Sequence, residues 1–214
     1  MGRDESRSVA RQPIRGLYAI TPDETDTAEL LRKVRLALQG GARVLQYRNK
    51  AAAAALRLRQ AEALRGLTRK FAVPLIVNDD VALAQQVDAD GVHLGGADGS
   101  VAEARALLGG RLIGVSCYNR LALAHEAASL GADYVAFGSF FASTVKPEAV
   151  VATPDLLRQA RGELAVPLVA IGGITPQNGA LLLEAGADAL AVISAVFAAP
   201  DIEGAAREFS NLFE

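Results

Sequence analysis

The sequence predicts a single-domain α/β fold, a closed (β/α)8 TIM barrel, on three observations. A short glycine-containing phrase recurs along the chain, it precedes apolar runs that number eight, and Ala/Leu-rich stretches of helical period separate those runs. One helix-to-strand joint used repeatedly indicates βα units and a parallel sheet. Eight such units in a chain of this length favour a closed barrel over an open doubly wound sheet, although the count alone does not exclude the open sheet.

The recurring phrase marks where helices end and strands begin. It reads Gly-Gly-Ala-Arg-Val at 40–44, Gly-Ala-Asp-Tyr-Val at 131–135 and Gly-Ala-Asp-Ala-Leu at 186–190, with a looser Asp-Ala-Asp-Gly-Val at 88–92. A glycine in the left-handed conformation ends a helix and leads by a tight turn into a buried strand. We therefore expect strands near Gly16–Thr21, Val44–Arg48, Leu75–Asp79, Gly91–Gly95, Leu112–Cys117, Tyr134–Ser139, Leu168–Gly173 and Ala189–Ser194. Helices are expected in the gaps, for example Thr27–Gln39, Ala51–Phe71, Val81–Val87, Val101–Leu108 and Leu121–Leu130.

Composition narrows the class of protein. The 214 residues fit one domain with no internal linker, and the formal net charge of −2 provides no global basic field for nucleic acid or an anionic membrane. A single cysteine, Cys117, excludes an intramolecular disulfide and fits a reducing compartment. No apolar run approaches the length of a membrane span. Residues 1–15 are polar and are interpreted as a disordered leader before a barrel at 16–214, in a protein expected to be cytoplasmic.

Polar residues gather where the predicted strands end. The strand interiors are almost wholly apolar, whereas the ends carry Thr21, Gln46, Arg48, Asn78, Asp79, Ser116, Gly138, Ser139, Gly172, Gly173 and Ser194. Enzymes with a (β/α)8 barrel place their chemistry at this rim, so the asymmetry predicts a site there.

The ends of the second and third predicted strands carry charged residues of the kinds that bind phosphate and metal ions. Arg48 and Lys50 can hold a phosphate, although two nearby cations also suit a solvated turn. Asp79 can ligate Mg²⁺, with Asp98 on the next loop as a second carboxylate, because Mg²⁺ takes few protein carboxylates and completes its shell with phosphate and water. The competing interpretation is helix capping, in which Asp80 caps the next helix while Asp79 faces the rim.

The later strand ends suggest a second anion site. The connection after the sixth strand is long and contains Ser143, Thr144 and Lys146, which can close over an anion or lie on a plain surface loop. Gly172-Gly173 and Ser194 follow the seventh and eighth strands, where these barrels build phosphate sites.

Three reactive side chains are given structural interpretations. His93 lies within a strand and is expected to be a core histidine with a satisfied N–H rather than a catalyst. His125 lies on an outer helix and is expected to be solvated. Cys117 has no histidine near it in the pattern, which argues against a nucleophilic thiol.

Taken together and in order, these motifs resemble the thiamine phosphate synthase family, over about residues 16–197. The family's Gln-x-Arg-x-Lys is matched at 46–50, its Asn-Asp at 78–79, its Gly-Val-Ser at 114–116, and its late motifs by Ile-Gly-Gly-Ile-Thr at 171–175 and Val-Ile-Ser at 192–194. Gly91-Val-His-Leu-Gly95 with Asp98 resembles the stretch that carries the family's second metal carboxylate. One departure is Val145, where the family has a second hydroxyl; others are Gly96 and Gly99-Ser100 around Asp98.

The resemblance implies an activity and a set of roles. The family couples an aminopyrimidine methyl diphosphate to a thiazole phosphate, giving thiamine phosphate and pyrophosphate. It implies two small phosphorylated substrates, Mg²⁺ held by Asp79 and Asp98, and catalytic contributions from Arg48, Lys50, Ser116 and Lys146. The pyrimidine diphosphate would contact Gln46, Tyr47, Arg48, Asn49, Lys50, Asn78, Ser116 and Lys146. The thiazole phosphate would contact Ser143, Thr144, Val145, Gly173, Ile193 and Ser194.

Two alternatives stay open at this point, a thiazole tautomerase on the same barrel and a non-catalytic phosphate-binding paralogue. A tautomerase moves a proton and needs a base, whereas the condensation needs none, because the thiazole nitrogen attacks with a lone pair and has no proton to lose. The loop at 140–153 is further expected to close over the bound substrates. A homo-oligomer is possible on the sequence alone.

Overall fold

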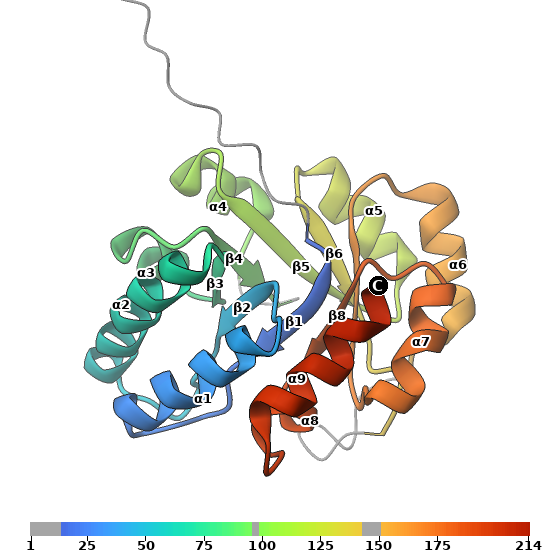
Figure 1. Cartoon of the computed structure of the whole chain (residues 1–214). Coiled ribbons are helices and arrows are strands. Elements are labelled where there is room, and N and C mark those ends of the chain that lie inside the picture. The colour runs from blue at the N-terminus through green and yellow to red at the C-terminus, as the bar shows by residue number, and fades with distance from the viewer. Residues whose placement is uncertain (1–13, 96–98, 143–150) are drawn as a thin grey trace, which may run out of the picture.

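A computed structural model describes residues 14–95, 99–142 and 151–214 of the chain, and it confirms the predicted barrel. Eight parallel strands close in the order β1-β2-β3-β4-β5-β6-β7-β8, each hydrogen-bonded to its neighbours in sequence and β8 to β1. The helices form a ring around the sheet (Figure 1). The strands are β1 (Gly16–Ile20), β2 (Val44–Tyr47), β3 (Leu75–Asn78), β4 (Gly91–Leu94), β5 (Leu112–Tyr118), β6 (Tyr134–Phe137), β7 (Leu168–Ile171) and β8 (Ala189–Val192).

The helices follow the strands as expected, with small shifts at their ends. They are α1 (Thr27–Gln39), α2 (Ala54–Phe71), α3 (Val81–Gln86), α4 (Val101–Leu108), α5 (Leu121–Ser129), α6 (Pro154–Glu163), α7 (Pro176–Glu184), α8 (Ser194–Phe197) and α9 (Ile202–Ser210), followed by a 3-10 turn at Asn211–Phe213. The second helix begins at Ala54 rather than Ala51. Most strands stop one or two residues before the expected end, so predicted rim residues such as Arg48, Asp79 and Gly172 lie on the loops that follow. Gln46, Asn78 and Ser116 lie within their strands.

Two apolar layers fill the molecule. The larger lies between the outer face of the sheet and the helices, and it includes Leu17, Leu45 and Val77. The smaller fills the barrel and includes Tyr18, Ile76 and Tyr134. Successive residues of a strand point to opposite faces, so every strand except β4 contributes apolar side chains to both layers; the inward positions of β4 are Gly91 and His93.

Three Arg–Asp pairs hold the amino ends of neighbouring strands together. Each aspartate belongs to the recurring phrase and lies directly before the strand that the phrase introduces. Its carboxylate accepts one hydrogen bond from a backbone N–H at the start of the preceding strand and another from an arginine of a helix. The three sets are Asp90 with Leu75 N and Arg65, Asp133 with Ile113 N and Arg105, and Asp188 with Leu168 N and Arg161. In the first phrase the corresponding residue is Arg43. The aspartate in the phrase therefore has a structural role at the end of the barrel opposite the predicted site.

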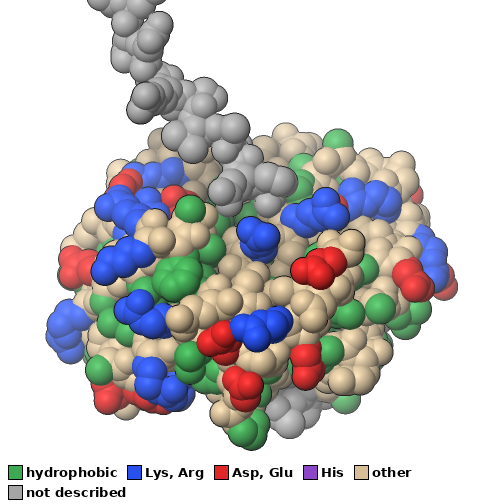
Figure 2. Space-filling view, in the orientation of Figure 1, with side chains coloured by type: hydrophobic (Ala, Val, Ile, Leu, Met, Phe, Trp, Pro, Cys, Tyr) green, Lys and Arg blue, Asp and Glu red, His purple; other side chains and the backbone are tan. Residues whose placement is uncertain are grey.

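The chain is already packed at Ile14, which is buried inside the barrel layer. This residue falls within the segment 1–15 predicted as a leader; residues 1–13 lie outside the described part. On the face shown in Figure 2, basic and acidic side chains are interspersed, in keeping with the small net charge. Among the described residues, no helix has both the length and the apolar character needed to cross a membrane.

The Arg–Asp pairs give a stability prediction. Asp90→Ala removes the acceptor of the buried Leu75 N–H, which lies 2.7 Å from the carboxylate, and of Arg65 Nη1 at 2.6 Å. We expect the free energy of unfolding to fall by roughly 1–3 kcal/mol, the cost of leaving a buried donor unpaired. Chemical denaturation measures it, and turnover per folded molecule should not change.

The matched control is Asp155→Ala, which breaks an exposed pair with Arg158 on α6. That substitution should change stability by less than about 1 kcal/mol. Equal losses in the two variants would contradict the role given to Asp90.

Candidate active site

The carboxyl end of the barrel carries an inward-facing polar layer. Period-two alternation continues the inward positions of Val44 and Ile76 to Gln46 and Asn78, and that of Gly114 to Ser116. Strand register places Asn78 beside His93. Gln46 is almost fully buried, whereas Asn78 and Ser116 are partly open. The prediction that polar side chains gather at the carboxyl ends of the strands is therefore confirmed.

The end of β2 is fixed by contacts that the sequence did not suggest. Thr21 is fully buried; its hydroxyl donates to the carbonyl of Arg48 and accepts from the same residue's N–H, both at 2.8 Å. Asp23 accepts from the Lys50 N–H at 3.0 Å and pairs with the Arg48 guanidinium at 3.4 Å. The loop after β1 therefore sets the backbone from which both predicted phosphate-binding cations project.

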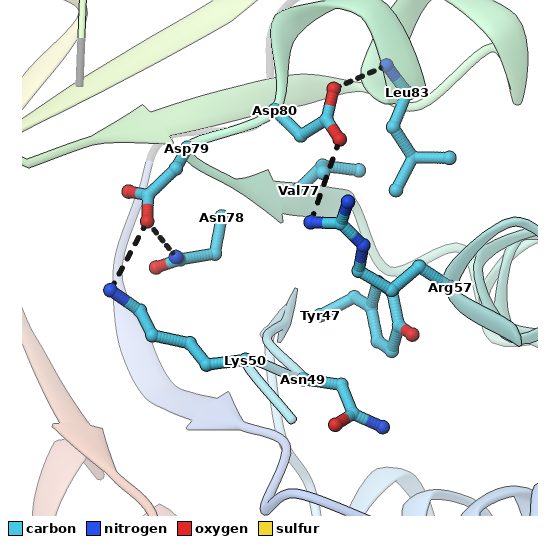
Figure 3. Close-up of a pocket in the computed structure, with 9 residues that line it drawn as sticks. All are labelled: Tyr47, Asn49, Lys50, Arg57, Val77, Asn78, Asp79, Asp80 and Leu83. Carbon is cyan, nitrogen blue, oxygen red and sulfur yellow. Dashed lines mark hydrogen bonds and ion pairs between the residues drawn. The ribbon is translucent and has the colours of Figure 1, made fainter. Parts of the chain in front are cut away.

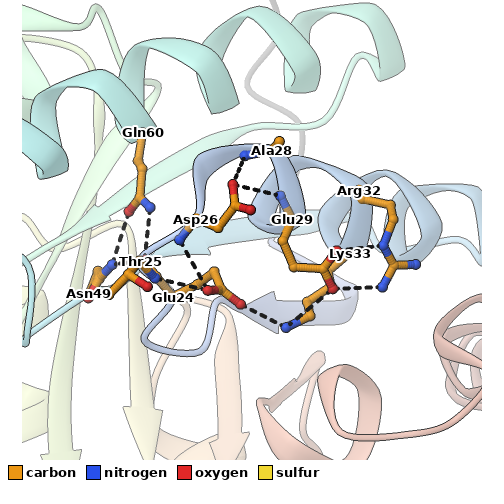
Figure 4. A network of polar contacts seen from close by, with 9 residues as sticks. All are labelled: Glu24, Thr25, Asp26, Ala28, Glu29, Arg32, Lys33, Asn49 and Gln60. Carbon is orange, nitrogen blue, oxygen red and sulfur yellow. Dashed lines mark hydrogen bonds and ion pairs between the residues drawn. The ribbon is translucent and has the colours of Figure 1, made fainter.

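Tyr47 and Asn49, predicted to contact the pyrimidine diphosphate, have structural partners. The Tyr47 hydroxyl donates to Gln60 Oε1 at 2.8 Å, and Asn49 Nδ2 donates to the same oxygen at 3.0 Å and to the Glu24 carbonyl at 2.7 Å. Figure 4 shows Asn49 and Gln60 within this network, which continues through Glu24 to Lys33. The Lys33 hydrogen bond holds the pKa of Glu24 below its usual value. The side-chain polar groups of Tyr47 and Asn49 thus hold the loop that follows β2. A role for these two residues at the substrate stays a prediction.

A cavity of about 260 Å³ opens between the ends of β2 and β3 (Figure 3). Lys50 Nζ lies 3.4 Å from Asp79 Oδ2, and Asn78 Nδ2 donates to the same oxygen at 2.6 Å. Asp79 adopts a positive φ of 62°, a conformation that aspartate tolerates better than most residues. The family resemblance implies that Lys50 and Asn78 contact the diphosphate and that Asp79 holds the metal, and these three side chains lie together at this cavity.

Asp80 has the capping role that the sequence suggested. Its carboxylate accepts from the Leu83 N–H at 2.9 Å at the start of α3, and it lies 3.8 Å from Arg57 of α2. Asp79 is left facing the cavity, as predicted. Arg57 also lines this cavity, and its Nε is buried with no hydrogen-bond partner in the described part of the chain.

The donor set at this point suits Mg²⁺ that is also bound by phosphate. Asp79 supplies a carboxylate and Asn78 an amide oxygen, hard ligands of the kind that Mg²⁺ prefers. Within residues 14–95, 99–142 and 151–214, no three His, Cys, Asp or Glu side chains gather as an all-protein metal cage. A cation here would therefore depend on substrate oxygens and water. Asp98, the second predicted ligand, lies outside the described residues.

Gly172 and Gly173 follow β7 with positive φ values of 103° and 62°. A Cβ at Gly173 would stand 2.4 Å from the Ala142 carbonyl, and one at Gly172 would stand 2.0 Å from Ser139 Oγ. Both glycines are therefore required for the close approach of the segment after β6. Ser194 is exposed at the start of α8, and Ile193 before it is half-buried. Ser143, Thr144, Val145 and Lys146, the loop residues predicted to bind phosphate, lie outside the described residues.

His93 is a buried core histidine, as expected. Both of its ring nitrogens are paired, and one partner is Ser116 of the predicted site. Nε2 lies 2.9 Å from Ser116 Oγ, and Nδ1 lies 3.1 Å from the Tyr134 hydroxyl. The sequence reasoning missed Tyr134 and its neighbour Tyr18, because a strand tyrosine is usually a plain core residue.

The other two reactive side chains fit their structural interpretations. Burial raises the pKa of the Cys117 thiol to about 12, which removes it as a nucleophile near neutral pH. His125 is exposed, as expected, and pairs with Glu163 at 2.7 Å.

Comparisons with known proteins agree with this arrangement. The family model described as thiamine monophosphate synthase matches residues 17–196. The chain is 58% identical to a thiamine-phosphate synthase of Methylobacillus flagellatus over 202 residues, covering 94% of this chain and 96% of that one. It is 56% identical to the thiamine-phosphate synthase of Azoarcus sp., covering 94% and 98%.

A solved structure gives the same answer. The thiamine phosphate pyrophosphorylase of Pyrococcus furiosus superposes with a TM-score of 0.83 at 38% identity, covering 92% of this chain and 94% of that one. More distant barrels, such as a 3-hexulose-6-phosphate synthase at 17% identity, share the fold alone. With a family model spanning most of the barrel and relatives above half identity over nearly their whole length, the chain belongs to the thiamine monophosphate synthase family.

Proposed function

We propose that this chain condenses an aminopyrimidine methyl diphosphate with a thiazole phosphate, releasing pyrophosphate and forming thiamine phosphate. Membership of the synthase family supports this reaction. The observation that carries it in the structure is the cluster of Lys50, Asn78 and Asp79 around one cavity at the carboxyl rim, with Arg48 on the same strand end. A cation, a carboxylate and an amide side by side suit a diphosphate bound together with a metal ion.

The bond changes need no protein base. The bond between the pyrimidine methylene carbon and the diphosphate oxygen breaks, and its electron pair leaves with pyrophosphate. The ring amino group stabilises the resulting cation. The thiazole nitrogen then forms the new carbon–nitrogen bond with its lone pair and loses no proton. The cations and carboxylates of the rim fit this scheme, because they bind and neutralise charge.

The residues divide the work by charge. Arg48 and Lys50 bind the diphosphate and offset the negative charge that grows on the leaving group. Asp79, with Asp98, holds Mg²⁺, and the bound ion would neutralise further charge on the departing pyrophosphate. Gln46, Asn78 and Ser116 hold the pyrimidine. Gly173, Ile193 and Ser194, with Ser143 to Val145, hold the thiazole phosphate, and Lys146 assists the leaving group.

The two substrates occupy different parts of the rim in this proposal. The diphosphate lies over β2 and β3, and the monophosphate lies over β7 and β8, which neighbour one another on the far arc of the barrel. The partners are then two small phosphorylated molecules, and a cytoplasmic location is proposed with them. Separation of the sites allows each substrate to be tested alone.

The first functional prediction concerns the metal. Asp79→Ala removes the carboxylate that faces Asn78 and Lys50, and we expect turnover to fall by roughly 10²-fold or more while the fold is retained. Steady-state rates with and without chelator, together with a far-ultraviolet circular dichroism spectrum, measure this. Full activity in chelator, or in the variant, would remove Asp79 and Mg²⁺ from the mechanism.

The second functional prediction concerns the separation of the two phosphates. Arg48→Ala should raise the KM for the pyrimidine diphosphate by roughly tenfold to a hundredfold, because a charged hydrogen bond is lost. The KM for the thiazole phosphate should change little. The control is Arg35→Ala, at an exposed position on α1, which should leave both constants unchanged. An equal rise for both substrates in Arg48→Ala argues against separate sites.

A further inference from the structure

A continuous chain of hydrogen bonds crosses the inside of the barrel from β2 to β5. Gln46 Nε2 donates to the Tyr18 hydroxyl at 2.9 Å, and that hydroxyl lies 2.8 Å from the Tyr134 hydroxyl. Tyr134 OH lies 3.1 Å from His93 Nδ1, and His93 Nε2 lies 2.9 Å from Ser116 Oγ. Its two ends, Gln46 and Ser116, are both placed at the pyrimidine by the proposed function. Its three middle members have no role in that account.

The strands shape the space for the chain. Tyr18 and Tyr134 are both essentially fully buried, with ring centres 6.0 Å apart. A Cβ at Gly114 would stand 2.0 Å from Tyr134 Cζ and 2.4 Å from its hydroxyl oxygen, so β5 has no side chain where the Tyr134 ring lies. The phenol therefore stands where it can join Tyr18 to His93.

The middle members carry a fixed number of protons. Burial raises the pKa of Tyr18 and of Tyr134, so each phenol keeps its single proton. His93 is buried and its two ring nitrogens face hydroxyl groups rather than carboxylates, so the ring is neutral and has one N–H. Each of the three groups can therefore donate one hydrogen bond within the chain.

This proton count makes the chain directional. With Gln46 donating to Tyr18, the Tyr18 proton goes to Tyr134, and the Tyr134 proton goes to His93 Nδ1. The imidazole proton is then on Nε2 and is donated to Ser116. A reversal at any one link leaves a buried donor or acceptor unpaired, which is costly inside a barrel. The whole chain can reverse only if the Gln46 amide turns over and the imidazole proton moves to Nδ1.

We propose that Tyr18, Tyr134 and His93 are positioning residues that fix which groups Gln46 and Ser116 present to the substrate. In this direction, Gln46 keeps its carbonyl oxygen as a free acceptor, and Ser116 keeps its hydroxyl proton as a free donor. No donor to the Gln46 oxygen is found within the described residues. The hydrogen-bond chain thus links the hydrogen-bonding character of the two residues that the proposed function places at the pyrimidine.

The pattern suits an aminopyrimidine. The exocyclic amino group is a donor and matches the Gln46 oxygen, while a ring nitrogen or a diphosphate oxygen is an acceptor and matches the Ser116 hydroxyl. Reversal of the chain would present an amide N–H to the amino group and an oxygen lone pair to an acceptor. This inference rests on the proposed function for the identity of the ligand, but the direction of the chain belongs to the free protein.

The direction can be read without substrate by ¹⁵N nuclear magnetic resonance of the histidines. The protein has only 2 histidines in its sequence, and the variant His125→Gln removes the exposed one on α5, so that the remaining signals can be assigned to His93. We expect His93 to be neutral at pH 7 with its proton on Nε2. Tyr134→Phe, which keeps the ring and removes the hydroxyl, should change the Nδ1 shift because that nitrogen loses its donor. A proton on Nδ1, or a spectrum unaffected by Tyr134→Phe, overturns the proposal.

Kinetics test the effect on the site. Tyr134→Phe should raise the KM for the pyrimidine diphosphate by roughly tenfold, as expected for one hydrogen bond, and leave the KM for the thiazole phosphate within about twofold. Tyr18→Phe should act alike. The double variant should cost little more than the larger single loss, because both break one chain. The control is Thr68→Val, which removes a buried hydroxyl bonded to the Arg65 carbonyl in α2 and should change neither constant.

The outcomes separate this proposal from the function on which it rests. Losses of equal size for both substrates, or single losses that multiply in the double variant, would refute a directional chain while the wild type remains active. A wild type that forms no thiamine phosphate refutes the proposed function, whatever the histidine spectrum shows.

Discussion

Inside a closed barrel of parallel strands, every polar group must find a partner in the protein or in the ligand, because the neighbouring strands already use the backbone groups. This constraint orders the inward face of the barrel. Below the rim the layer is apolar, built from residues such as Ile76 and Val169. Closer to the carboxyl ends of the strands, polar side chains enter the barrel, and they are hydrogen-bonded to one another in the chain that runs from Gln46 to Ser116. The groups left over at the rim are the ones available to a substrate.

The two ends of the barrel have different tasks. At the amino ends, carboxylates such as Asp90 and Asp133 bind backbone N–H groups and helix arginines, so their charge serves stability. At the carboxyl ends, Asp79 meets Lys50 at a partly open cavity, where charge can serve a ligand. Charged residues therefore stabilise the fold at the amino ends of the strands and are available to a ligand at the carboxyl ends, which is the usual division in barrels of this class.

Sequence reasoning predicted the features that repeat or that lie at strand ends. The eight strands, the cap at Asp80 and the rim position of Asp79 were predicted from local patterns, because punctuation and period-two alternation are local signals. Contacts between distant segments were not predicted. Tyr18 and Tyr134 are 116 residues apart, and neither differs in sequence from an ordinary core aromatic. Asn49 likewise turned out to be bonded to Gln60 of α2, a pairing that depends on how the helix packs.

The measurement that tests the central claim most directly is release of pyrophosphate from the aminopyrimidine methyl diphosphate by the purified wild-type chain, followed with and without Mg²⁺ and the thiazole phosphate. The account predicts that one thiamine phosphate forms for each pyrophosphate released when the metal and both substrates are present, and that release fails without the metal. Full release in chelator, or no thiamine phosphate when all three are present, would contradict it.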